Sequence, residues 1–169
     1  MQLALMTGRL LFAAGKENRT MEQRTLDALS SALYLSRLTL RGEAADTDDK
    51  RLRASGLYPD WAPGVHKSGE IYNAAGQTWE CIQNYDTGVY PDIVPGGSAW
   101  GTFHRPLHGT SPETAREFVP VTGAHDTYKP WEYAWFEGTL YRCLSETAYS
   151  PAEYGAAWAL DVEKKEDEA

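Results

Sequence analysis

The heptapeptide Gly76-Gln77-Thr78-Trp79-Glu80-Cys81-Ile82 returns 62 residues later as Gly138-Thr139-Leu140-Tyr141-Arg142-Cys143-Leu144 (138 − 76 = 62). The same offset relates three pairs upstream of it: His66 and Tyr128, Lys67 and Lys129, and Glu70 and Glu132. Each copy is followed by a proline and then by a tryptophan, Trp100 or Trp158, at the shorter offset of 158 − 100 = 58. Self-similarity at a fixed period indicates repeated structural units, so the sequence predicts two small modules in tandem.

Each copy has the residue pattern of a β-hairpin. In the first copy, strands are predicted around residues 70–72 and over 77–83, with a turn at 73–76. In the second copy, residues 133–136 and 139–145 are the predicted strands, and Glu137-Gly138 suits a two-residue primed turn. The predicted fold is mainly β, with two small tandem modules of short antiparallel strands that follow a helical N-terminal segment.

Composition divides the chain further. Residues 1–56 are rich in Leu, Ala, Arg and Glu and are predicted to be a helical attachment or oligomerisation segment, with an acidic linker at 43–50. We assign residues 57–106 to the first module, 107–117 to a connector, 118–162 to the second module and 163–169 to a charged tail. Modules of about 45–50 residues are near the lower size limit of an independent core, so they need to bury large aromatic side chains.

The N-terminal segment contains a predicted helix with an apolar face. Thr20-Met21-Glu22-Gln23 has the spacing of a capping box. Four leucines follow with helical periodicity and heptad character, and Ser36 takes the remaining heptad position: Leu26, Leu29, Leu33 and Leu40. This face fits either a helix packed within its own chain or an assembly helix that joins copies or docks on a larger particle.

Charge and hydropathy argue against two classes of partner. The formal net charge of −8 disfavours nucleic acid, because phosphate contacts need a basic surface. No run approaches the ~20 apolar residues of a membrane span. Residues 1–12 are apolar but lack a basic start and a clean cleavage site, so we expect no signal peptide. We therefore expect synthesis in the cytoplasm, with lysis as one route to the outside.

The two cysteines, Cys81 and Cys143, occupy the same position in the two copies. A disulfide within a small module needs both partners in that module, so we predict two reduced, buried thiols. A bridge between the modules is the alternative. A metal site is not predicted, because neither cysteine has a second one near it.

Several motifs resemble a known family. The motifs of the first copy are Tyr58-Pro59-x-Trp61-x-Pro63-Gly64, Gly69-Glu70-Ile71 and Gly76-x-x-Trp79-x-Cys81 with a late Trp100. They are similar to the carbohydrate-binding modules of families five and twelve, the chitin-binding type 3 domains. The second copy has Thr122-Gly123-Ala124-His125-Asp126-x-Tyr128 and Glu137-Gly138-x-x-Tyr141, which resemble a variant found in small tail-associated proteins of bacteriophages and prophages. The likeness covers roughly residues 57–160.

The resemblance implies a compact, sandwich-like β fold and a ligand-binding aromatic just before the proline that follows the Cys-containing strand. Tyr90 and Tyr149 match that position. The sequence departs from the family at four places. His66 replaces an aromatic, Asn84-Tyr85 a His-Thr pair, Trp131 a glycine, and tyrosine the usual tryptophan before the proline. These differences bear on chitin as the ligand more than on the fold.

A saccharide site needs a flat aromatic ring for stacking, with polar groups around it. Tyr90 and Tyr149 lie in predicted loops, where they either bind a ligand or cover a small core. Trp131, Tyr133 and Trp135 alternate, so on a strand they share a face opposite Phe136. That face is either an exposed aromatic platform, with Trp131 and Trp135 as candidate carbohydrate-binding residues, or a contact with the first module. The predicted core residues are Trp61, Trp79, Cys81, Trp100, Tyr141, Cys143 and Trp158.

Catalytic motifs are missing from the sequence. His66, His104, His108 and His125 are scattered without metal-ligand spacing, and no Gly-x-Ser-x-Gly elbow occurs. Pairs of carboxylates among Asp86, Asp92 and Glu132 are no more than an acidic chain offers. We predict no enzyme, no cofactor and no metal.

Together these features predict a non-enzymatic, tail-associated virion protein of a phage or prophage. Its expected partners are a host cell-surface polysaccharide, other virion proteins and a further copy bound through residues 1–42. The alternative is a purely structural baseplate, tail-fibre or head-decoration protein whose modules contact other virion proteins. An accessory module of a cell-wall hydrolase is a third class, disfavoured because the sequence contains no catalytic domain.

Overall fold

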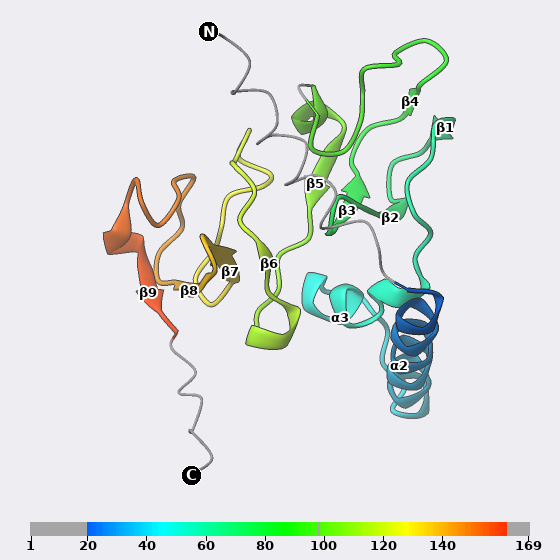
Figure 1. The fold of residues 1–169 in the computed structure, drawn as a ribbon, viewed down its shortest axis with the longest axis horizontal. Coiled ribbons are helices and arrows are strands. Elements are labelled where there is room, and N and C mark those ends of the chain that lie inside the picture. Colours follow the sequence, from blue (N-terminus) through cyan, green and yellow to red (C-terminus); the bar gives the residue numbers. More distant parts are fainter. Residues whose placement is uncertain (1–19, 98, 162–169) are drawn as a thin grey trace, which may run out of the picture.

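The computed structural model describes residues 20–97 and 99–161, so residues 1–19 of the predicted N-terminal segment and the predicted charged tail lie outside it. The described residues form helices α2 (Met21–Leu40) and α3 (Asp48–Arg53), followed by nine short strands in three sheets (Figure 1). The predicted fold class, mainly β after a helical N-terminal segment, is confirmed. None of the helices in this part of the chain is long and apolar enough to cross a membrane.

The repeated stretch forms the central hairpin of each module. Strands β2 (Ile71–Ala74) and β3 (Gln77–Cys81) pair antiparallel, as do β7 (Tyr133–Phe136) and β8 (Thr139–Cys143). The turn residues have φ of 50° and 76° at Ala75-Gly76 and 51° and 77° at Glu137-Gly138. Positive φ at both central residues is the signature of the primed turns that match the twist of paired strands. The first turn is therefore narrower than the predicted 73–76, and Asn73 and Ala74 belong to β2.

In each module a further strand pairs with the second strand of the hairpin, and its register corrects the predicted equivalence of Trp100 and Trp158. Strand β5 (His104–Pro106) pairs with β3 and places His104 opposite Cys81, whereas β9 (Trp158–Leu160) pairs with β8 and places Trp158 opposite Cys143. The equivalent of Trp158 is thus His104, at an offset of 158 − 104 = 54. Trp100 lies in the preceding 3-10 turn (Trp100–Thr102) and meets Trp79 edge-on at 5.1 Å. The first module has eight more residues between its second and third strands (62 − 54 = 8).

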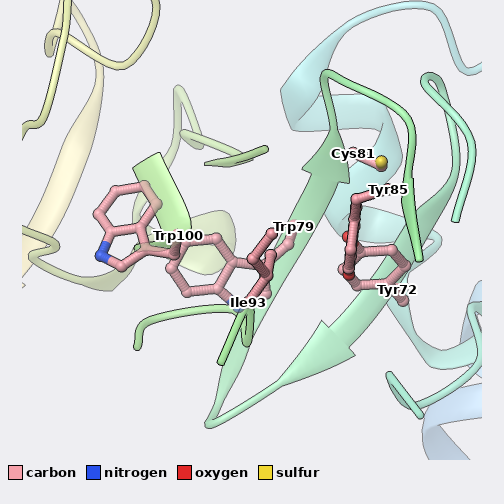
Figure 2. Packing of buried hydrophobic residues seen from close by; sticks show 6 residues of the cluster. All are labelled: Tyr72, Trp79, Cys81, Tyr85, Ile93 and Trp100. Carbon is pink, nitrogen blue, oxygen red and sulfur yellow. The ribbon is translucent and has the colours of Figure 1, made fainter. Parts of the chain in front are cut away.

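Each module has its own aromatic core. In the first, Trp79, Trp100 and Ile93 pack together with Tyr72, Tyr85 and Cys81 (Figure 2). In the second, the buried residues are Tyr128, Ala134, Cys143, Ala157 and Trp158. Of the other predicted core residues, Trp61 and Tyr141 are half-buried and pack against these clusters.

Both cysteines are free and buried, as predicted. Each thiol donates a hydrogen bond to the carbonyl two residues later, Gln83 for Cys81 (3.1 Å) and Ser145 for Cys143 (3.0 Å). Burial raises the pKa of Cys143 to about 11, so this thiol stays protonated at neutral pH and packs as a small hydrophobe.

The short strands extend the repeat upstream. Strand β1 (Val65–His66) pairs with β4 (Tyr85–Asp86), and the bridge between Tyr128 and Thr147 repeats the pair of His66 and Tyr85 at the 62-residue offset. Strand β6 (Arg116–Glu117) runs parallel to β7, and the Tyr133 N–H donates to the Gly109 carbonyl (2.8 Å). The predicted connector of residues 107–117 is therefore part of the second sheet. A two-residue strand is too short to have a recognisable pattern.

The predicted acidic linker of residues 43–50 is likewise partly ordered secondary structure, because its last three residues begin helix α3. Thr47 caps α3, which lies between α2 and the second sheet (Figure 1). The Asp48 carboxylate accepts two hydrogen bonds from Arg105 (2.7 and 2.8 Å), and Asp49 accepts from the Thr110 N–H (3.2 Å). Burial raises the pKa of Asp48, but the hydrogen bonds and charge of Arg105 outweigh burial and leave it below its ordinary value. These contacts span about 60 residues of sequence, so no local pattern indicates them.

Helix α2 starts at the predicted cap, where the Thr20 hydroxyl accepts from the Gln23 N–H (3.1 Å). One side of it lies on the turn at Ser55–Leu57. The Ser31 hydroxyl accepts from the Gly56 N–H (3.1 Å) and donates to the Arg53 carbonyl (3.2 Å). Ser31 and Leu38, seven residues apart, are the buried residues of the helix. The predicted leucine face lies on the opposite side and is exposed: Leu26, Leu29, Leu33 and Leu40.

Candidate functional site

The large aromatic side chains fall into a buried and an exposed set. Trp79, Trp100 and Trp158 are at most 7% exposed, whereas Tyr90, Tyr149 and Trp131 are 56%, 59% and 65% exposed. Exposed aromatics of this size are unusual enough to mark interaction surfaces when they gather with polar groups. Two of the exposed three come from the predicted ligand loops, and the third takes a glycine position.

Trp131 has a backbone conformation that few residues of its size adopt. Its φ is 75°, and the equivalent residue of the first module is Gly69 with φ 91°. Both N–H groups make the same contact, to the Cys143 carbonyl (2.9 Å) and the Cys81 carbonyl (2.8 Å). A bulky residue with positive φ costs of order 1–3 kcal/mol. Since Trp131 is also exposed, this cost does not serve the core, and it points to a role at the surface.

The face around Trp131 contains a second aromatic and a cation. The Arg142 guanidinium lies over the Trp131 ring, 4.8 Å from its centroid. Arg142 is the cross-strand partner of Tyr133, so the two side chains share one side of the sheet. We call Trp131, Tyr133 and Arg142 the Trp131 face.

The predicted platform is only partly realised. Tyr133 and Trp135 share the side of β7 that faces away from buried Ala134, as the alternation predicts. Trp131 precedes the strand and reaches this side through its left-handed backbone. Trp135, at 36% exposure, stands opposite Leu140 further along the strand.

Tyr149 projects from a loop with a fixed backbone. Its N–H donates to the Thr147 hydroxyl (3.0 Å), and its carbonyl accepts from the Trp158 indole N–H (3.0 Å). Next to it, Ser150 and Glu153 form the capping box noted in the sequence, with hydrogen bonds of 2.8 and 2.9 Å. Tyr154 meets the Tyr149 ring edge-on at 6.5 Å and is half exposed. The sequence interpretation missed Tyr154, and its place right after the capping box was the available signal.

Tyr90 has a corresponding setting in the first module. Its N–H donates to the Asp86 carbonyl (2.9 Å), and its own carbonyl accepts from the N–H of buried Ile93 (3.2 Å). The Asp86 side chain closes the turn by accepting from the Gly88 N–H (2.7 Å). Tyr90 and Tyr149 follow their cysteines by nine and six residues (90 − 81 and 149 − 143), so they correspond in loop but not in register.

A polar cleft of about 730 Å³ lies between the modules and α3. Several of its charged and titratable groups are paired with each other. Arg105 bonds to Asp48 and Glu80, and His108 Nδ1 lies 2.9 Å from Glu132 while its ring stacks on Tyr128. These pairs hold the described segments together. Among the described residues, no group of three or more His, Cys, Asp or Glu side chains is placed to hold a metal ion.

Comparison with known proteins finds neither a family model nor a curated protein that matches this chain. Since fold alone does not imply function, the functional argument depends on the exposed side chains and on the motifs of the two copies.

Proposed function

We propose that this protein is a non-enzymatic, tail-associated virion component that presents two carbohydrate-binding-like modules to a host-surface glycan. The observation that supports glycan binding best is the exposure of Tyr90, Trp131 and Tyr149 on backbones fixed by hydrogen bonds. The virion setting rests on the resemblance of the second module to phage tail-associated proteins.

Exposed aromatics suit a saccharide for a physical reason. A sugar ring has an apolar face of C–H groups that stacks on an aromatic ring, and its hydroxyls need polar groups at the rim. One such contact is weak, worth about 0.5–1.5 kcal/mol. Two modules in one chain make the second contact intramolecular, and this raises the overall avidity without any new contact.

The two loop tyrosines give the first test. We expect Tyr90→Ala or Tyr149→Ala to weaken binding to immobilised wall polysaccharide by about 0.5–1.5 kcal/mol. Phenylalanine at either position should keep most of the affinity, because the ring face remains. Melting temperatures should barely change, since exposed substitutions stay within about 0.5 kcal/mol. If stability falls while binding persists, these tyrosines stabilise the folded module, and the purely structural alternative is favoured.

Helix α2 supports a further part of the proposal, association of copies through residues 1–42. Leu26, Leu29 and Leu33 fall on the a and d positions of a heptad, and the buried Ser31 and Leu38 lie on the opposite face. Docking on the module therefore turns the leucines outward. An exposed apolar stripe of this kind fits another helix, and a second copy supplies a matching one.

Size-exclusion chromatography with light scattering tests the helix. We expect wild type to be oligomeric and Leu29→Ser/Leu33→Ser to be monomeric but still folded, because both leucines are exposed in one chain. Val89→Ser, an equally exposed site outside the helix, is the matched control and should stay oligomeric. A monomeric wild type would rule out self-association and leave the leucines for another virion protein.

The structural alternative has one observation in its favour, the same exposed leucines. A baseplate, tail-fibre or head-decoration protein also needs protein contacts. In such a protein the exposed aromatics would also serve protein contacts. Neighbouring proteins in the particle would cover Tyr90, Trp131 and Tyr149, and these residues would not recognise free polysaccharide.

A further inference from the structure

Arg142 is a half-buried arginine to which the described residues supply no carboxylate partner. Among the described residues, no carboxylate oxygen lies within 4.0 Å of Arg142, whereas two other half-buried arginines, Arg51 and Arg105, each have at least one such ion pair. Its Nε is buried and has no hydrogen-bond partner. The chain has 24 acidic and 16 basic residues, so a partly buried arginine that has no ion pair among the described residues is unexpected. A cation in this setting favours binding of an anion that the described residues do not supply.

The first module has different residues at the positions of the Trp131 side chain and its two neighbours. At the positions of Trp131, Tyr133 and Arg142 the first module has Gly69, Ile71 and Glu80 (131 − 69 = 133 − 71 = 142 − 80 = 62). Ile71 faces Glu80 across the strands as Tyr133 faces Arg142. Glu80 is neutralised by Arg105 at 2.8 Å. All three positions differ, and the change replaces an internal ion pair with an aromatic and cationic face that only the second module has.

We propose that the Trp131 face binds an anionic group, a carboxylate or a phosphate, carried on a glycan; this rests on the proposed function. The guanidinium offers a planar fork of donors that matches either group. The stack on Trp131 orients that fork, and the 65% exposure of Trp131 leaves room for a sugar ring beside it. The Tyr133 hydroxyl interacts with both Asp161 and Arg142, and among the described residues Asp161 forms no ion pair with Arg142.

The test compares three probes: an oligogalacturonate, a glycerol phosphate polymer and a neutral N-acetylglucosamine oligomer. We expect wild type to bind at least one anionic probe more tightly than the neutral one. Arg142→Gln should weaken that anionic binding about tenfold or more and change neutral binding less than twofold. Arg142→Lys, which keeps the charge but loses the fork, should fall between them. If Arg142→Gln loses binding only to the oligogalacturonate, the bound group is a carboxylate. If it loses binding only to the glycerol phosphate polymer, the bound group is a phosphate.

Two controls make the outcome decisive. Lys67→Gln removes one exposed positive charge from the first module and should leave all affinities unchanged. Melting temperatures confirm that each variant is folded. If wild type binds the neutral oligomer as well as the anionic probes and Arg142→Gln changes nothing, the inference is wrong but the proposed function stands. If no glycan binds at all, both fail.

Discussion

Replacing Trp131 with glycine is expected to stabilise the protein and at the same time to abolish most of its glycan binding. The stabilisation comes from relief of the left-handed backbone, since glycine adopts φ near 75° without strain. After loss of the cation–π contact with Arg142, the net gain should be about 0.5–1 kcal/mol. The loss of binding should reach about 2 kcal/mol, the scale of a tryptophan at the centre of a binding surface.

Opposite signs of the two effects make this variant informative. Urea unfolding gives the stability, and titration of wall polysaccharide gives the affinity. Gly69→Ala is the matched control: it places a side chain in the same left-handed conformation (φ 91°), and its Cβ meets nothing within 4 Å. That variant should lose about 1 kcal/mol of stability through strain alone and keep its affinity. A Trp131→Gly protein that is less stable and still binds would make Trp131 a packing residue.

Acidification is expected to produce the largest change in stability, through His104. Burial, with a smaller contribution from the charge of His66, lowers the pKa of His104 to about 4, against about 6.5 in an unfolded chain. The folded state therefore binds fewer protons between these values, so stability is complete above pH 6.5 and is lost as the pH falls toward 4. The full loss is about 3 kcal/mol, of which about 2 occurs between pH 7 and pH 4.5.

The hydrogen bonds around His104 explain why it stays neutral. Its side chain is fully buried, with Nε2 2.9 Å from the Tyr85 hydroxyl, which already accepts from the Trp61 indole N–H (2.8 Å). The hydroxyl can then donate to an unprotonated Nε2. Urea unfolding across pH 4.5–7 measures the slope, and His104→Phe should flatten it. An unchanged slope in His104→Phe would assign the pH dependence to another group.

The sequence was sufficient for the parts of the fold that depend on local pattern. The 62-residue offset located both hairpins, and Glu137-Gly138 identified a primed turn because that turn needs positive φ at two adjacent residues. The buried cysteines followed from their equal positions in the two copies. These features are set by residues within one hairpin.

Features that depend on distant segments were not predictable in the same way. Pairing Trp100 with Trp158 matched residue types, but the register places His104 opposite Cys81. The structural role of Asp48 is to pair with Arg105, which lies 57 residues away in the sequence. At the candidate surface, Trp131 could be identified from the sequence because it stands where the resembled family has a glycine. Arg142 was missed, although a position-by-position comparison with Glu80 in the first module would have shown the reversal of charge.

The central claim, that the exposed aromatics of the two modules bind a glycan, is tested most directly on an array of bacterial wall polysaccharides. The account predicts that wild type binds at least one polysaccharide and that a Tyr90→Ala/Trp131→Gly/Tyr149→Ala variant with a wild-type far-UV spectrum binds none. An array on which the folded wild-type protein binds nothing, or on which the triple variant binds as well as wild type, would contradict it.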